Sequence, residues 1–109
     1  MGYSYLASPF THTDPAIQKQ RFEKACAVAA KLMKGGTVIF APIPHSYSIE
    51  QFFDKPEGFD FWMYHDLPLL QGADRLIVLK LPGWKKSRGV AREIQEAQEI
   101  GMPIEYINE

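Results

Sequence analysis

The sequence predicts an α/β fold built around a parallel sheet, and two observations lead to this prediction. Residues 37–42 (TVIFAP) and 75–81 (RLIVLKL) are nearly continuous apolar and β-branched runs, a pattern typical of strands covered on both faces. Such runs alternate with longer segments of helical periodicity, in the order strand, helix, strand, helix, strand, helix, strand. Because right-handed crossovers connect parallel strands, this order predicts four to five parallel strands arranged 2-1-3-4.

A first strand is expected at residues 3–8 (YSYLAS), and the long helix that follows it has clear boundaries. Thr13 or Asp14 serves as its N-cap, and Gly35 ends it. Residues at spacings of three and four form one apolar face: Phe22, Ala25, Cys26, Ala29, Leu32 and Met33. Cys26 lies among alanines on this face, so we interpret it as a small, buried structural residue.

The middle of the chain is predicted to contain a loop and then a helix. Residues 43–57 are expected to form a long functional loop, because this stretch contains prolines and lacks periodicity. Residues 59–74 have helical spacing, and we expect a helix that is kinked or restarts near Pro68. Its periodic positions are Trp62, His65, Asp66, Leu69, Leu70 and Ala73.

The last third of the chain predicts a strand, a loop, a helix and a final strand. Loop 82–87 follows the strand at 75–81, and Ser87 is a suitable N-cap for a helix that Gly101 ends. Val90, Ile94, Ala97 and Ile100 are expected to form the buried stripe of this helix. A shorter strand is expected at residues 102–107 (MPIEYI).

Composition and charge restrict the functions that are open to the chain. The 109 residues are 46% hydrophobic, which favours one globular domain spanning residues 1–109. Twelve basic and thirteen acidic side chains give a net charge of -1, which argues against binding to duplex nucleic acid. No apolar run has the length of a membrane span and no signal-like start is present, so we expect no membrane partner and a cytoplasmic location.

Neither a metal ion nor a cofactor is expected. His12, His45 and His65 lack the spacing of zinc ligands, and Cys26 is the only cysteine. The sequence contains no G-x-G-x-x-G motif, no Walker motif, and no serine in a G-x-S-x-G turn. Standard dinucleotide binding, NTP hydrolysis and triad chemistry therefore have no support in the sequence.

A ligand site is expected at the carboxyl ends of the strands. Ligands of open parallel sheets bind where the strand order reverses, which for the order 2-1-3-4 lies between the first and third strands. Residues 7–12 and 82–89 meet at that point, with residues 42–46 close by. The substrate-binding candidates in these loops are Ser8, His45, Trp84, Ser87 and Gly89.

Glu93 is a candidate for chemistry at this crevice. Side chains on a helix lean toward its N-terminus, so Glu93 is expected to lie over position 89, which is a glycine. An unobstructed carboxylate at the mouth of the crevice suits a nucleophile or a ligand-binding acid. The alternative is that Gly89 allows close helix–sheet packing and Glu93 is a surface charge.

Three further groups have two interpretations each. Asp66 is either a buried acid with a catalytic use or a cap for the helical turn that carries Pro68. The hydroxyl of Tyr5 either reaches the crevice or ends inside the core. Lys85 and Lys86 precede the last helix, where they form either a phosphate site or a solvated pair.

Three segments resemble the nucleoside 2-deoxyribosyltransferase-like proteins, and especially a short bacterial and phage branch of them. They are residues 5–12 (YLASPFTH), 65–79 (HDLPLLQGADRLIVL) and 83–104 (GWKKSRGVAREIQEAQEIGMPI). The resemblance implies a flavodoxin-like three-layer sandwich. It also implies roles for three residues: Glu93 attacks the anomeric carbon to form a covalent glycosyl-enzyme, Asp66 helps to protonate the departing base, and Tyr5 orients the nucleophile.

The resemblance also bears on the substrate. Ser87 aligns with a serine that contacts phosphate in nucleotide-cleaving relatives, and with Lys85 and Lys86 it favours a 5'-phosphorylated substrate. Because the chain stops at Glu109, we expect no counterpart of the C-terminal segment that completes a neighbour's base pocket in the transferases. Residues 43–58 are expected to supply that wall. Their candidates for stacking on a base are Tyr47, Phe52 and Phe53.

These features leave three hypotheses of function. The first is cleavage or transfer at the N-glycosidic bond of a nucleoside or nucleoside 5'-monophosphate, with Glu93 as nucleophile. The second is a binding module that holds a nucleotide or nucleotide sugar without chemistry. The third is an interaction protein whose helix 59–64 presents exposed Phe61, Trp62 and Tyr64 as a dimer face. We expect a homo-oligomer, either a dimer or a tetramer.

Overall fold

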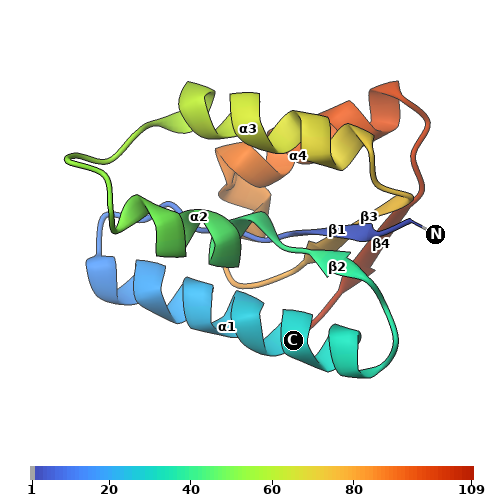
Figure 1. The fold of residues 1–109 in the computed structure, drawn as a ribbon, viewed down its shortest axis with the longest axis horizontal. Coiled ribbons are helices and arrows are strands. Elements are labelled where there is room, and N and C mark those ends of the chain that lie inside the picture. The colour runs from blue at the N-terminus through green and yellow to red at the C-terminus, as the bar shows by residue number, and fades with distance from the viewer. Residues whose placement is uncertain (1) are drawn as a thin grey trace.

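The computed structural model describes residues 2–109 as a parallel sheet with helices on both faces (Figure 1). The elements in chain order are β1 (Ser4–Ala7), α1 (Pro15–Lys34), β2 (Ile39–Phe40), α2 (Pro42–Glu50), α3 (Phe59–Gln71), β3 (Arg75–Leu79), the 3-10 turn η1 (Trp84–Lys86), α4 (Arg88–Glu99) and β4 (Ile104–Ile107). The four strands are all parallel and lie in the order β2-β1-β3-β4. The predicted α/β class and the strand order 2-1-3-4 are confirmed, with four strands in residues 2–109.

Alternating side chains of the central strands fill two apolar layers. On one face, side chains of β1 and β3 pack against α3 and α4: Tyr5, Ala7, Leu76 and Val78 with Leu70, Val90 and Ala97. On the other face, their alternate side chains pack against α1: Leu6, Ile77 and Leu79 with Val28 and Ala29. The predicted three-layer sandwich is therefore present, consistent with a flavodoxin-like fold.

Helix α1 has the predicted ends but a shorter buried face. Asp14 caps it by accepting a hydrogen bond from the Ala16 amide at 2.9 Å, and Gly35 ends it. Met33 is 53% exposed and Cys26 is only half-buried, so the predicted burial of both residues is wrong. Met33 lies near the end of α1, where a helix of about 30 Å extends beyond strands of about 15 Å. Cys26 lies in the middle of the helix, beside the buried face that Ala25, Val28 and Ala29 form.

The prediction of a loop over residues 43–57 is wrong, because α2 occupies Pro42–Glu50. Pro42 and Pro44 lie in its first turn, where backbone N–H groups have no partner within the helix. The prolines therefore start this helix instead of preventing it. Only residues 51–58 form the connection to α3.

Three other elements differ from their predictions. The sequence predicts Ile100 in the buried stripe of α4, but this residue is the C-cap of the helix and is 47% exposed. Strand β2 has only two residues and lies at the sheet edge, with Val38 beside it 50% exposed, so it is not a strand covered on both faces. Pro42 shortens it by beginning α2. Helix α3 runs from Phe59 to Gln71 with Pro68 in its exposed last turn, so the predicted restart does not occur.

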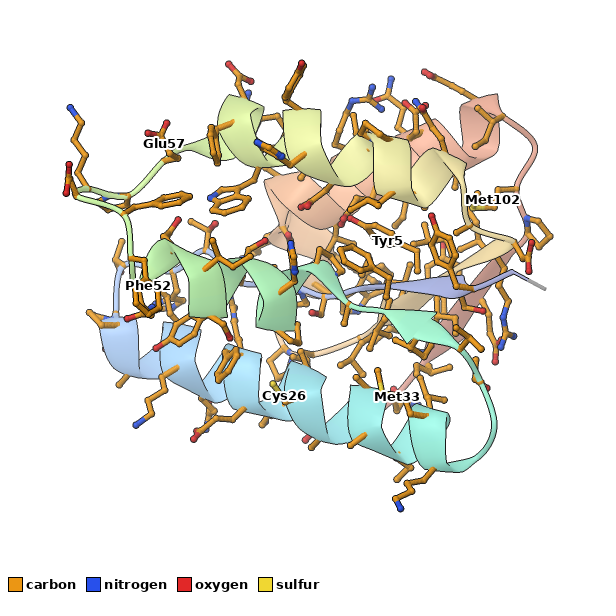
Figure 2. All side chains as sticks on the ribbon, in the orientation of Figure 1. Tyr5, Cys26, Met33, Phe52, Glu57 and Met102 are labelled. Atoms are coloured by element: carbon orange, nitrogen blue, oxygen red, sulfur yellow. The ribbon has the colours of Figure 1, made fainter. Side chains whose placement is uncertain are left out.

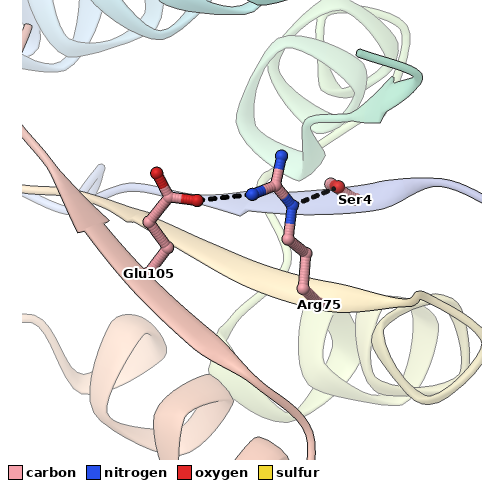
Figure 3. A network of polar contacts seen from close by, with 3 residues as sticks. All are labelled: Ser4, Arg75 and Glu105. Atoms are coloured by element: carbon pink, nitrogen blue, oxygen red, sulfur yellow. Dashed lines mark hydrogen bonds and ion pairs between the residues drawn. The ribbon is translucent and has the colours of Figure 1, made fainter.

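Arg75 connects three neighbouring strands at the amino-terminal edge of the sheet (Figure 3). Its Nε donates to Ser4 Oγ of β1 at 2.9 Å, and its Nη1 pairs with Glu105 Oε1 of β4 at 2.5 Å. This network stabilises the edge opposite the one where a ligand is expected. Within residues 2–109, none of the helices has the length and apolar character needed to cross a membrane.

Candidate functional site

A buried tyrosine and a buried glutamate meet between the sheet and its helices. Tyr5 of β1 is fully buried and lies in the layer below α3 and α4 (Figure 2). Its hydroxyl donates a hydrogen bond to Oε2 of Glu93, which lies on α4 and is 4% exposed. The fold thus joins two of the candidate residues, which are 88 positions apart in the sequence.

Both sequence-based interpretations of the Glu93 environment are wrong. Glu93 is neither an open carboxylate at the mouth of a crevice nor a surface charge, because α3 covers this side of α4. A Cβ atom added at Gly89 would lie 3.8 Å from Cε of Met63 on α3, an ordinary contact. Gly89 therefore faces a neighbouring helix instead of the sheet or an open crevice.

Asp66 is the third member of this acid cluster. It lies in the middle of α3, is 4% exposed, and is too far from the helix ends to be a cap. Its negative charge raises the pKa of Glu93 and also that of Tyr5, which places the three groups within electrostatic range. Of the two interpretations of Asp66, the buried acid is the one that the fold supports.

Burial dominates the electrostatics of the cluster. It raises the pKa of Glu93 to about 8, while the hydrogen bond from Tyr5 acts in the opposite direction. Burial also raises the pKa of Asp66 to about 7, and burial together with the charge of Glu93 raises the pKa of Tyr5 well above its usual value. Near neutral pH the two carboxyl groups therefore share roughly one proton. Acids shifted in this way are typical of functional sites.

A cavity of about 260 Å³ opens between α2 and α3, beside Asp66. It is lined by His45, Ile49, Phe53, Phe61, Trp62, His65, Asp66 and Leu69. Trp62 is held in place because its Nε1 donates to Glu50 Oε2 at 3.0 Å, and the ring of Phe53 is nearly parallel to it with 5.8 Å between centroids. The cavity is mostly aromatic and apolar, with few polar groups, as small-molecule sites usually are. Asp66 belongs both to this cavity and to the cluster with Glu93.

Comparison with known proteins places the chain in a family. Residues 2–109 match a family described as a domain of unknown function (DUF1937). The chain belongs to the DUF1937 family. No curated protein sequence matches it.

A solved structure has a similar fold. It is a 2-deoxyribosyltransferase from the psychrotolerant bacterium Bacillus psychrosaccharolyticus, with a TM-score of 0.69 and 19% sequence identity. The match covers 97% of this DUF1937 chain and 72% of the other chain. The predicted resemblance to nucleoside 2-deoxyribosyltransferase-like proteins is thereby confirmed at the level of the fold.

The predicted substrate-binding residues of the DUF1937 chain fall into two groups. His45 lines the cavity, whereas Ser8 is 5% exposed and lies outside the cavity lining, with no hydrogen-bond partner for its Oγ in residues 2–109. The hydroxyl of Ser87 instead accepts from the Val90 amide at 3.2 Å as the N-cap of α4. Trp84 packs against the core, and its ring centroid lies 5.7 Å from that of Tyr106.

The aromatic residues of α2 and α3 are arranged differently from the prediction. Phe61 and Trp62 line the cavity and are half-buried, so the predicted dimer face retains only Tyr64, which is 80% exposed. Tyr47 stacks on Phe22 with 4.2 Å between ring centroids, and this contact occupies a ring that was expected to stack on a base.

The cavity residues share a signal that was present in the sequence. Positions 61, 62, 65, 66 and 69 follow helical spacing, and all five line the cavity. Phe53 alone keeps its predicted place at a possible base site, because Phe52 is 89% exposed. In the part of the chain that the structure describes, no three His, Cys, Asp or Glu residues are grouped to hold a metal ion.

Proposed function

We propose that this DUF1937 protein cleaves or transfers at the N-glycosidic bond of a nucleoside or nucleoside 5'-monophosphate, through a covalent glycosyl-enzyme on Glu93. The observation that carries the proposal is the buried cluster of Tyr5, Asp66 and Glu93 beside an aromatic cavity. The structurally similar 2-deoxyribosyltransferase, which is described as a catalyst of nucleoside synthesis, supports the same class of reaction.

Two carboxyl groups divide the reaction into two steps. The Glu93 carboxylate attacks the anomeric carbon, the bond from this carbon to the base breaks, and its electron pair stays on the base nitrogen. Asp66 supplies the proton that neutralises the departing base. A second base or a water molecule then attacks the anomeric carbon and releases Glu93, while Asp66 accepts a proton. A base as acceptor gives transfer, and water gives hydrolysis.

The reactive form of the pair carries its proton on Asp66. Because the pKa of Glu93 (about 8) lies above that of Asp66 (about 7), this is the less populated of the two singly protonated forms. The hydrogen bond from Tyr5 favours the charged form of Glu93 and lowers its pKa. Positive charge that develops on the sugar in the transition state stabilises the Glu93 carboxylate further. Burial raises the pKa of Asp66 to about 7, so this carboxyl group can exchange a proton near neutral pH, as a general acid must.

The aromatic cavity is the place for the base. Phe53 and Trp62 offer ring faces, and stacking on an aromatic side chain contributes about 1–3 kcal/mol per base. Asp66 lies on the same wall, where it can reach a ring nitrogen of a base bound there. Ser8 has a free buried hydroxyl, and exposed Lys85 supplies positive charge for a 5'-phosphate at the start of α4.

One observation favours a different function. Glu93 is buried and does not line the cavity, so the cavity can hold a nucleotide without exposing it to a nucleophile. A non-catalytic nucleotide-binding or nucleotide-sugar-binding module is therefore the second candidate. It predicts a ligand-dependent rise in melting temperature with no change in the ligand.

The two functions are separated by one assay. Ribo- and deoxyribonucleosides and their 5'-monophosphates are incubated with the protein, and free base is measured by chromatography. We expect base release, faster from the monophosphates than from the parent nucleosides because of the basic residues before α4. A folded protein that releases no base from any of these compounds would contradict the proposal, and melting shifts with the same compounds would then support the binding module.

Replacing Asp66 with asparagine is expected to slow base release by roughly 10²–10⁴-fold, the usual contribution of general acid catalysis. The wild-type rate should be greatest between about pH 7 and 8, where one proton is shared by the pair, and should fall on both sides. In Asp66→Asn the alkaline decline should disappear, because no acid remains to lose its proton. Rates measured from pH 5 to 10 check this, with exposed Asp60→Asn on the same helix as the control.

An unchanged pH profile in Asp66→Asn would remove Asp66 from the mechanism. A second test of the role of Asp66 uses a different leaving group. A nucleoside whose base departs without protonation should be cleaved almost as fast by Asp66→Asn as by the wild type.

A further inference from the structure

Arg21 connects the two loops that border the expected ligand crevice. It lies on α1, on the opposite face of the sheet from Glu93. Its Nη1 donates to the carbonyl oxygen of Thr11 at 2.9 Å, and its Nη2 donates to the carbonyl oxygen of Pro82 at 3.1 Å. Thr11 follows β1 and Pro82 follows β3, the adjacent strands between which the strand order reverses.

The conformation of the second loop is adapted to this contact. Gly83 has φ +90°, which residues with a side chain rarely adopt. A Cβ atom at Gly83 would also lie 2.7 Å from Nη2 of Arg21, which is closer than real Cβ contacts. Gly83 therefore provides both the turn and the space that the guanidinium occupies.

We propose that Arg21 is a positioning residue that sets the separation of these two loops and thereby the affinity for substrate. One loop carries Ser8 with its free, buried hydroxyl, and the other leads into η1 and the start of α4. A planar guanidinium with several fixed donors can bind two carbonyl groups at once, whereas a flexible lysine ammonium is a poor substitute. The kinetic part of this proposal rests on the proposed function.

Steady-state kinetics of Arg21→Leu and Arg21→Lys test the proposal. The substrate is the monophosphate with the fastest base release, and the temperature is one at which circular dichroism shows each variant to be folded. We expect KM to rise roughly tenfold, the equivalent of about 1.4 kcal/mol, in Arg21→Leu, with kcat changed little because the acid cluster is untouched. Lys24→Leu is the matched control, since Lys24 lies on the same helix and pairs with Glu109 at 3.4 Å instead of the loops.

The proposal further predicts coupling between Arg21 and Gly83. Gly83→Ala should raise KM in the wild-type background both by displacing the guanidinium and by straining the turn at φ +90°. Only the strain remains in Arg21→Leu, so the substitution should add less there. A lower melting temperature in Arg21→Leu with an unchanged KM would show a merely structural role and overturn the proposal. So would fully additive effects of the two substitutions.

Amide hydrogen exchange on the unliganded protein separates this proposal from the proposed function. Arg21→Leu should accelerate exchange in residues 8–14 and 81–87 together, whereas Lys24→Leu should affect neither segment. If the wild type releases no base, the proposed function fails while the exchange result still decides whether Arg21 couples the loops. Faster exchange in only one segment, or in neither, would overturn the coupling.

Discussion

Glu93→Gln is expected to reduce base release by several orders of magnitude while leaving the fold intact. A glutamine amide cannot form the ester that a glycosyl-enzyme requires, so the two-step route is lost. The side chain has nearly the same shape, and its carbonyl oxygen can still accept the hydrogen bond from Tyr5. Base release is measured by chromatography, and the glycosyl-enzyme is detected by mass spectrometry of rapidly quenched wild-type protein.

Glu99→Gln is the matched control for this experiment. Glu99 is the last residue of α4 and is exposed, and its Oε1 accepts a hydrogen bond from Nε2 of Gln95, one turn earlier. It should retain the wild-type rate. Turnover by Glu93→Gln at the rate of this control would remove Glu93 from the mechanism and leave direct attack by water as the route to free base.

The same substitution is expected to make the protein more stable at pH 8. Burial raises the pKa of Glu93 from 4.5 to about 8, so the folded state binds this proton more tightly than the unfolded state does. Stability from this group is complete below pH 4.5 and is lost as the pH rises to about 8. Through Glu93 alone, the wild type should lose on the order of 3 kcal/mol between pH 5 and 8.

Urea unfolding at pH 5 and pH 8 measures this loss in the wild type and in Glu93→Gln. The variant has no charge to bury, so its stability should decline less and exceed that of the wild type at pH 8. Glu96→Gln is a control of opposite sign, because hydrogen bonding to Gln71 and pairing with Arg92 lower the pKa of Glu96. Removing the negative charge of Glu96 should destabilise the fold at pH 8. A Glu93→Gln variant that is less stable than the wild type at pH 8 would contradict this account of the buried carboxyl group.

Both predictions rest on the burial of the same two carboxyl groups. Two neighbouring buried carboxyl groups oppose folding at neutral pH, and an apolar pair at positions 66 and 93 would pack without that cost. Functional sites often contain destabilising groups of this kind, since reactivity depends on their shifted pKa values. The direction of the pH effect on stability and the pH dependence of the rate therefore have the same physical origin.

Local patterns in the sequence were sufficient for most of the architecture. The apolar run at Arg75–Leu79 and the cap and stop residues of α1, Asp14 and Gly35, act within a few residues of themselves. Such signals depend on backbone geometry and on burial of one strand or one helix face, so they are readable along the chain. They predicted the α/β class and the parallel order 2-1-3-4, both of which are confirmed.

The prolines of α2 show where local signals fail. Prolines such as Pro42 and Pro44 are common in loops, but a helix can also begin with them. The segment has no clear periodicity, so the sequence could not distinguish a loop from a helix here. The exposure of Met33 could not be predicted from the sequence either, because it depends on how far α1 extends past the sheet.

The candidate site depends both on the sequence and on the tertiary structure. The residue types and spacing that suggested Glu93, Asp66 and Tyr5 were present in the sequence by itself. Their burial, their raised pKa values and the hydrogen bond between Tyr5 and Glu93 are consequences of packing α3 and α4 on the central strands. The same is true of the cavity between α2 and α3 and of the contacts of Arg21 with two loops. Only the tertiary structure could decide these features, because desolvation and hydrogen bonding depend on which distant segments surround a group and not on its neighbours in the chain.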